Sequence, residues 1–323
     1  MSESTEQASA GNAAAPKAEL QSLLKPRRIA VEVIGFLIGA ALLTWCIWSA
    51  VEDGDWRRLA SADPKLILGM AGCSIISLLI NGAIFWIVIR PVKPLRLRDM
   101  ELLNLVTSVL NYAPIRAGLI ARVAYHLRVD RLSLLTIGAW LAAIACTLGL
   151  VMGAVLAAVL LRGRLDWITA AIIGVLIVGG ALITRSLMHV PLVQAQGRGL
   201  HVMLRDNAAL WGALGLRLID IAAWTGRMGC AIAILGLPLD GSQVALLAVV
   251  AIAMSLVPLG RLGYREAGVA LFASYLSMSN DELGKAAEQL ALIESAGEAI
   301  VAIPLGALAL LWYRHRWRLA AQG

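Results

Sequence analysis

The chain has 323 residues, of which 59% are hydrophobic and only 15% are charged. A soluble globular domain is usually about 45–50% apolar and about 25% charged. With a mean hydropathy of +0.78, this composition excludes a water-soluble enzyme, a disordered chain and a disulfide scaffold, and it predicts an all-α integral membrane protein. The net charge of +7 comes from basic residues that lie mostly between apolar runs. This placement indicates membrane orientation rather than nucleic-acid binding.

The apolar runs predict the number of transmembrane helices. A helix needs about 20 apolar residues to cross a hydrocarbon core of about 30 Å. This length predicts about six full spans within a single polytopic membrane domain, residues 26–316. The spans are expected at 29–50, 66–89, 133–161, 167–184, 208–235 and 286–313. Polar residues 1–25 are expected to form a disordered cytoplasmic tail, and residues 317–323 a cytoplasmic C-terminal tail.

The distribution of Lys and Arg predicts the orientation in the membrane. If the gaps between apolar runs alternate between two sides, the side that carries both termini holds 18 of the 28 basic residues and the other side holds 6. Cytoplasmic loops are enriched in Lys and Arg. Both termini are therefore predicted to be cytoplasmic.

Two further apolar stretches, about 99–127 and 243–278, are interrupted in the middle by Pro and Gly. Proline removes a backbone donor, and glycine permits a tight reversal. Each stretch is therefore predicted to be a re-entrant helical hairpin whose break is buried or lines a wet cavity. The alternative is two short full spans in each stretch, which gives about ten crossings with the same orientation. The residues at the breaks are Asn111, Pro114 and Gly118 in the first stretch and Pro258, Gly260 and Gly263 in the second.

The two broken stretches have opposite polarity on the predicted orientation, because the first enters from the cytoplasm and the second from the outside. Opposite polarity is typical of an inverted repeat, and transporters built this way bind substrate near the midplane between the repeats. The two breaks are therefore expected to meet in the interior of the protein.

Several ionisable residues lie at membrane depth, where a charge costs at least about 2.5–3.5 kcal/mol on insertion scales and marks a candidate functional site. The fifth span places Arg217, Asp220 and Arg227 on one helical stripe. The last span carries Glu294 and Glu298 at i, i+4 on one face. One interpretation is structural: Arg217 pairs with Asp220, and Arg227 pairs with Glu294 or Glu298, to hold helices together.

The other interpretation is that the arginines line a cavity for an anionic head group, because the planar guanidinium binds phosphate bidentately. Acidic side chains would then pair with the arginines when no substrate is bound. The predicted head-group ligands are Arg116, Arg122, Arg217, Arg227, Arg261 and Arg265, and the predicted charge partners are Asp220, Glu266, Glu294 and Glu298.

At the two breaks the sequence resembles the lysylphosphatidylglycerol synthase transmembrane-region family, a flippase-like domain found fused to, or independent of, lipid aminoacyl-transferase domains. The family pattern has an Asn, then Pro-x-Arg-x-Gly and a trailing Arg, followed later by a Gly-Gly-x-Gly-x-Arg-Glu loop. The matching residues are Asn111, Pro114, Arg116, Gly118 and Arg122 for the first motif and Gly260, Gly263, Arg265 and Glu266 for the second.

The chain departs from the family pattern at three positions. Leu119 stands where an acidic residue often follows the glycine, Arg261 replaces the middle glycine of the loop, and Glu294 stands near a usual arginine of the last span. The departures indicate a divergent branch. No hydrophilic stretch is long enough to fold as a synthase domain, so the resemblance is to the stand-alone form.

The resemblance implies a protein of the bacterial inner membrane that moves a lipid between leaflets. The expected partners are the bilayer and an anionic phospholipid, an aminoacyl-phospholipid or an isoprenoid-type lipid. An Arg-lined groove would reduce the cost of desolvating the head group. No Walker A string is present, so direct ATP drive is not expected, and no metal or cofactor site is predicted.

Two alternatives to a lipid translocase stay open. The first is a scaffold for an enzyme of a membrane-lipid pathway, such as aminoacyl-phospholipid or hopanoid synthesis. The second, less favoured, is an intramembrane lipid-modifying transferase with Glu266 or Glu298 as the base. Small residues in the spans leave oligomerisation open, because they suit packing within or between chains.

Overall fold

The computed structural model of the chain describes residues 26–53, 61–113, 117–191, 194, 199–257, 263–276 and 281–322. Over these ranges the protein is all-helical, without strands. Six of the described helices are long and apolar enough to cross a membrane, which confirms a multi-pass helical membrane protein. They are α2 (Pro26–Asp53), α4 (Pro64–Ile89), α7 (Leu134–Arg162), α8 (Trp167–Leu187), α11 (Asn207–Leu235) and α14 (Asp281–Gln322). The predicted disordered tail, 1–25, lies outside the described residues.

Several helices begin or end at capping residues supplied by the sequence. Each N-cap oxygen accepts a hydrogen bond from a backbone N–H that has no partner within the helix. Asp240 forms a full capping box with Gln243, and the hydrogen bond from the Ser242 hydroxyl holds the pKa of Asp240 below its ordinary value. Two long helices end on a glycine in the left-handed conformation, Gly163 and Gly236. The other N-caps with a side-chain hydrogen bond are Asp63, Ser133, Asp166 and Asp206.

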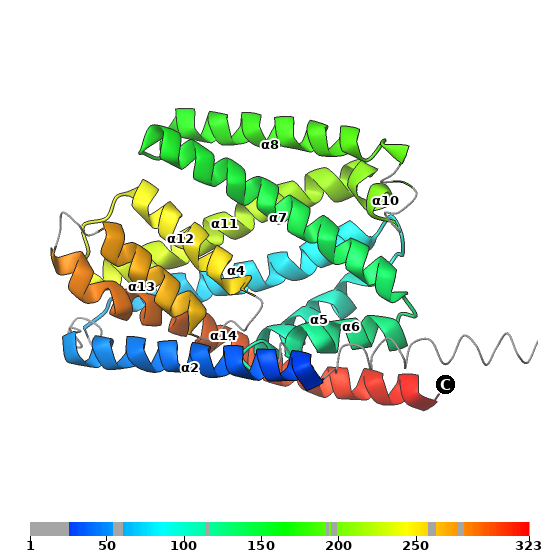
Figure 1. Cartoon of the computed structure of the whole chain (residues 1–323), viewed down its shortest axis with the longest axis horizontal. Helices are drawn as coiled ribbons and strands as arrows, with labels where there is room; N and C mark the ends of the chain where they lie inside the picture. Colours follow the sequence, from blue (N-terminus) through cyan, green and yellow to red (C-terminus); the bar gives the residue numbers. More distant parts are fainter. Residues whose placement is uncertain are drawn as a thin grey trace, which may run out of the picture.

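The two interrupted stretches fold as two pairs of short helices. The first pair is α5 (Leu97–Leu110) and α6 (Ala117–Arg128), and the second is α12 (Gly241–Ser255) and α13 (Tyr264–Leu276). In Figure 1 the first pair lies at the right-hand end of the bundle and the second at the left-hand end. The two members of each pair contact each other. Short helix α10 (Leu200–Arg205) leads into α11.

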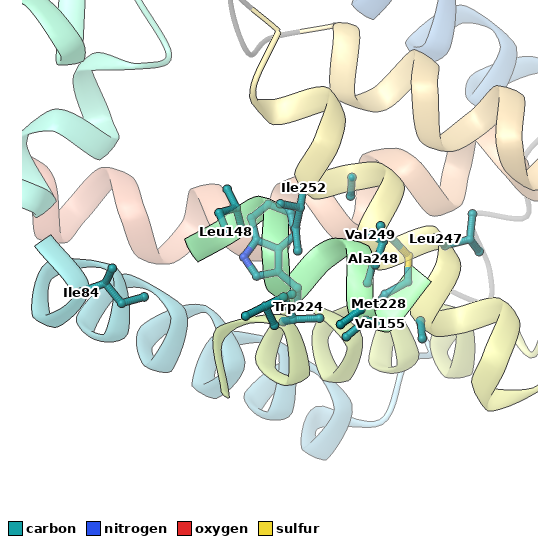
Figure 2. Close-up of a cluster of buried hydrophobic side chains, with 14 of the residues drawn as sticks. Ile84, Leu148, Val155, Trp224, Met228, Leu247, Ala248, Val249 and Ile252 are labelled. Atoms are coloured by element: carbon teal, nitrogen blue, oxygen red, sulfur yellow. The ribbon is translucent and has the colours of Figure 1, made fainter. Parts of the chain in front are cut away.

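The core lies where α4 and α11 pack along each other and are covered by α7, α12 and α14. Figure 2 shows Ile84, Leu148, Trp224 and Ile252, one side chain from each of α4, α7, α11 and α12, within this cluster. Helix α8 contacts the bundle mainly through α7 and exposes apolar side chains such as Val175 and Ile183. The charged residues in the middle of α11 and α14 are buried instead, namely Arg217, Asp220, Arg227, Glu294 and Glu298, as expected for a protein whose solvent is lipid.

Helix α14 is longer than the predicted span and continues to Gln322, so residues 317–322 belong to a helix rather than to a separate tail. Its last turns are held by contacts with the first short pair. Arg316 bonds Asp99 of α5 at 3.0 Å, and the Tyr313 hydroxyl lies 3.2 Å from the carbonyl oxygen of Ala121 in α6. Helix α2 begins and α14 ends toward the same end of the bundle (Figure 1).

Each short pair is packed through a glycine that admits no side chain. A Cβ on Gly118 of α6 would overlap the Thr107 carbonyl and the Asn111 side chain of the α5 end. Gly263, before α13, has φ +82° and rests on the Gly39 carbonyl of α2. The Tyr264 hydroxyl reinforces this contact with a 2.9 Å bond to the carbonyl of Gly35. Both positions therefore require glycine.

We expect Gly263→Ala to destabilise the protein strongly. The left-handed backbone costs a non-glycine residue about 1–2 kcal/mol, and the added Cβ also overlaps a backbone oxygen that cannot move without shifting α2. Thermal unfolding of the detergent-purified protein measures the effect. Gly138→Ala in α7 is the control, because a Cβ there meets no atom within 4 Å. Equal melting temperatures for the two variants would contradict this account of the α13 contact.

Candidate functional site

A cavity of about 620 Å³ lies among α4, α5, α6, α7, α11 and α12. Residues next to both breaks line it: Asn111 and Gly118 beside the first, and Leu256 and Val257 beside the second. The structure thus brings the ends of the two short pairs to one hollow, although the pairs lie at opposite ends of the bundle (Figure 1). The lining combines apolar α7 and α12 residues with polar and charged groups from α4, α5, α6, α11 and α14.

The Arg217–Asp220 pair of α11 forms part of the cavity wall. Arg217 Nη1 lies 3.1 Å from Asp220 Oδ2, and both side chains are almost fully buried. The Ser77 hydroxyl donates to Asp220 at 2.6 Å, and the Asn81 amide bonds both residues. Four side chains from α4 and α11 are therefore joined by hydrogen bonds, which neutralise the pair and fix its geometry, although Arg217 Nε has no acceptor among the described residues.

A second buried group joins α11, α13 and α14. Arg227 donates through Nε to Glu294 at 2.7 Å and lies 3.1 Å from Glu298. Arg265 bonds Glu298 at 2.8 Å and also Glu294. The indole ring of Trp224 lies under both guanidinium groups, at 4.2 and 4.8 Å from its centroid. We call Arg227, Arg265, Glu294 and Glu298 the four-charge cluster; its formal charges cancel.

Glu266 has a local role at the beginning of α13. It accepts a hydrogen bond from the backbone N–H of Gly263 at 2.7 Å and another from the Ser295 hydroxyl of α14. A carboxylate in the first turn of a helix also interacts favourably with the helix dipole. Glu266 therefore fastens the start of α13 to α14 and is not among the residues that line the cavity.

Arg122 of α6 is the other buried arginine of the cavity wall, and its partners are neutral. Its Nη2 donates to Asn104 Oδ1 at 2.8 Å and to Thr107 Oγ1 at 2.7 Å, both on α5. The Phe85 ring covers the guanidinium, with 3.5 Å between the ring centroid and Cζ. Among the described residues no carboxylate lies within ion-pair distance of Arg122.

The predicted head-group arginines separate into three groups. Arg122, Arg217 and Arg227 line the cavity, whereas Arg265 lies behind it and contacts it through the four-charge cluster. Arg116 and Arg261 lie outside the described residues, as do Pro114, Pro258 and Gly260. The ion pairs of the structural interpretation, Arg217 with Asp220 and Arg227 with Glu294 and Glu298, are all present.

Sequence reasoning missed the neutral polar residues that complete the site. Ser77 and Asn81 of α4, and Asn104 and Thr107 of α5, all line the cavity. Each lies in a mostly apolar stretch, and an amide or hydroxyl at membrane depth is the signal that would have identified it, because such a group needs a partner. Leu119, at the position where the resembled family often has an acid, also faces the cavity.

The geometry defines a polar cavity inside an apolar helical bundle, with one unneutralised cation in the described part of its wall. Among the described residues there is no group of three or more His, Cys, Asp or Glu side chains placed to hold a metal ion. No protein-family model matches this chain, and comparison with curated proteins and with solved structures gives no match either.

We expect Glu294→Gln to be strongly destabilising. Removing one member of a buried ion pair leaves an uncompensated charge, at a typical cost of about 3–5 kcal/mol, and Glu294 is fully buried between two arginines. The measurement is thermal unfolding in neutral detergent. Glu52→Gln is the matched control, because Glu52 is exposed and accepts from the Trp48 indole, a bond that glutamine also makes. If both variants lower the melting temperature equally, the cluster is not the charged network inferred above.

Proposed function

We propose that this protein is a flippase-like lipid translocase, in which an anionic or otherwise modified head group occupies the cavity while the lipid tails stay in the bilayer. The observation that carries the proposal is the cavity itself: about 620 Å³ with buried charged and amide side chains, inside helices whose outer faces are apolar. Moving a polar head group through hydrocarbon without hydrogen bonds costs several kcal/mol. The polar wall replaces part of the lost hydration.

On this proposal the two short pairs are re-entrant hairpins that form an inverted repeat. Helices α5, α6, α12 and α13 have 14, 12, 15 and 13 residues. At 1.5 Å per residue they measure about 18–23 Å, which is short of a hydrocarbon core of about 30 Å. The location of the pairs at opposite ends of the bundle, with residues beside both breaks lining one cavity, supports this arrangement.

We also propose the bacterial inner membrane as the location, with both termini in the cytoplasm. The excess of Lys and Arg on one side supports the orientation. The described chain begins and ends toward the same end of the bundle, as the proposed topology requires.

Membership of the lysylphosphatidylglycerol synthase transmembrane-region family is part of the same proposal. Asn111, Gly118 and Arg122 of the first motif line the cavity, and Arg265 and Glu266 of the second begin α13. Of the departures, Glu294 lies between Arg227 and Arg265, where it neutralises them. This arrangement supports a divergent branch in which the α14 position balances charge.

The contacts of the two candidate bases favour translocation over lipid modification. Glu266 is hydrogen-bonded to Gly263 and Ser295, and Glu298 is paired with Arg227 and Arg265. A general base must be able to reach the proton that it removes. Both carboxylates already bind groups of the protein, so neither is placed to take a proton from a substrate. A scaffold role is the outcome expected if the wild-type protein moves no lipid.

Gly149→Phe tests the cavity without touching any ion pair. Gly149 of α7 lines the cavity and a Cβ there meets no atom within 4 Å, so a benzyl group fits at the cavity wall and is expected to narrow the hollow. In liposomes that contain a fluorescent phosphatidylglycerol analogue, we expect leaflet exchange to fall about tenfold or more, equivalent to a barrier raised by about 1.4 kcal/mol or more.

The matched control is Gly153→Phe on the same helix, since Gly153 has equally open surroundings but is not part of the cavity lining. It should exchange lipid at the wild-type rate. Equal exchange by wild type and Gly149→Phe would show that lipids do not pass through this cavity.

A further inference from the structure

The described arginines of the site differ in how their charge is balanced. Arg217 is matched by Asp220. Arg227 and Arg265 share the two carboxylates Glu294 and Glu298. The formal charges therefore cancel within the Arg217–Asp220 pair and within the four-charge cluster. An anion entering there would have to displace a carboxylate from its arginine.

Arg122 is different because it is 5% exposed yet bonded only to neutral groups. Its Nη2 donates hydrogen bonds to Asn104 and Thr107, whereas its Nη1 has no hydrogen-bond acceptor among the described residues. Burying an unpaired cation is costly, and buried charges are ordinarily paired. In the described part of the chain, the half of the guanidinium that carries Nη1 therefore has no anionic acceptor.

The groups around Arg122 hold it in position rather than neutralise it. The Asn104 amide donates to the Leu78 carbonyl at 2.8 Å, and the Thr107 hydroxyl donates to the Asn104 carbonyl at 3.0 Å. Both side chains are thereby oriented with an oxygen toward Nη2. Gly118, one turn before Arg122, allows α6 to approach α5 closely enough for these bonds.

Glu101 of α5 is the acidic residue whose electrostatic influence on Arg122 has to be considered. It does not form an ion pair with it, because no Glu101 oxygen comes within 4 Å, and its Oε2 packs against Gly82 of α4 without a hydrogen-bond partner of its own. Glu101 is also not among the residues that line the cavity. Asp220 and Glu298, the carboxylates that line the described part of the cavity, are paired with other arginines, so a counter-ion for Arg122 is expected from a ligand.

We propose that Arg122 is the anion subsite of the cavity and binds one oxyanion, a phosphate, through Nη1 while the other arginines stay paired. Phe85 lines the cavity and covers the guanidinium, so the ring moves aside when the phosphate enters. Charge-assisted bonds from a guanidinium to phosphate are among the stronger hydrogen bonds in proteins. The inference rests on the proposed function only in taking the phosphate from a lipid head group; free phosphate has the same chemistry.

The test measures binding to the full-length protein in neutral detergent at fixed ionic strength by isothermal titration calorimetry. The probes are dihexanoyl phosphatidylglycerol and inorganic phosphate. Arg122→Gln should weaken binding about tenfold or more, the usual effect of losing a hydrogen bond to a charged group. Arg316→Gln is the control, because it removes the same charge from an arginine that pairs with Asp99 away from the cavity; it should bind as wild type does.

Phe85→Ala keeps the inference testable if Arg122→Gln does not fold. It uncovers the guanidinium, so both the affinity and the rate of binding should rise. Weaker binding by Phe85→Ala would overturn the covering role of the ring.

A third variant tests the competing site on α11. Arg217→Gln combined with Asp220→Asn removes a neutral pair without changing the net charge. If this double variant loses the probes while Arg122→Gln retains them, or if wild type binds neither probe, the inference is wrong.

The two probes identify the source of the anion. Arg122-dependent binding of the lipid alone assigns a head group, and equal, competing binding of inorganic phosphate assigns a free oxyanion; either result supports the subsite. Leaflet exchange separates this inference from the proposed function. If phosphate binding depends on Arg122 but the wild-type protein moves no lipid, the subsite is supported and translocation is rejected. If Arg122→Gln moves lipid at the wild-type rate, translocation is supported and the role of Arg122 as its anion subsite is rejected.

Discussion

Helices α11, α13 and α14 meet at two arginines and two glutamates that are almost completely buried. An unpaired charge in the interior costs several kcal/mol, so no member of this four-charge cluster is stable there without the others. Lipid supplies little hydrophobic drive for helix association. The placement of α13, and with it the side of the cavity that Arg227 and Glu298 line, therefore depends on charge pairing and close packing together.

The two short pairs are anchored by related devices at opposite ends of the bundle (Figure 1). In the first, Gly118 lets α6 approach α5; in the second, Gly263 lets the start of α13 rest on the backbone of α2. Gly306 of α14 similarly lies against the Leu105 carbonyl of α5. Small residues permit such backbone contacts, and here they hold helices of 12–15 residues against their neighbours.

The cavity wall is electrostatically asymmetric, and this asymmetry underlies both of our proposals. Its α11 part carries charges that cancel, whereas Arg122 on α6 is held by neutral oxygens. On our proposal the paired charges of α11, α13 and α14 hold the cavity wall together, and Arg122 binds the anionic ligand.

The sequence alone determined the helical membrane class, the six long spans and the position of both interruptions, because apolar length and Pro/Gly placement are local properties. It also placed Arg217 with Asp220, since i, i+3 neighbours on a helix must meet. Only the tertiary structure decided that Arg265 shares Glu294 and Glu298 with Arg227, that Ser77 and Asn81 of α4 complete the Asp220 site, and that Arg122 has no carboxylate partner among the described residues. Those contacts join residues far apart in the chain, and helical periodicity fixes which face a side chain occupies but not which helix packs against that face.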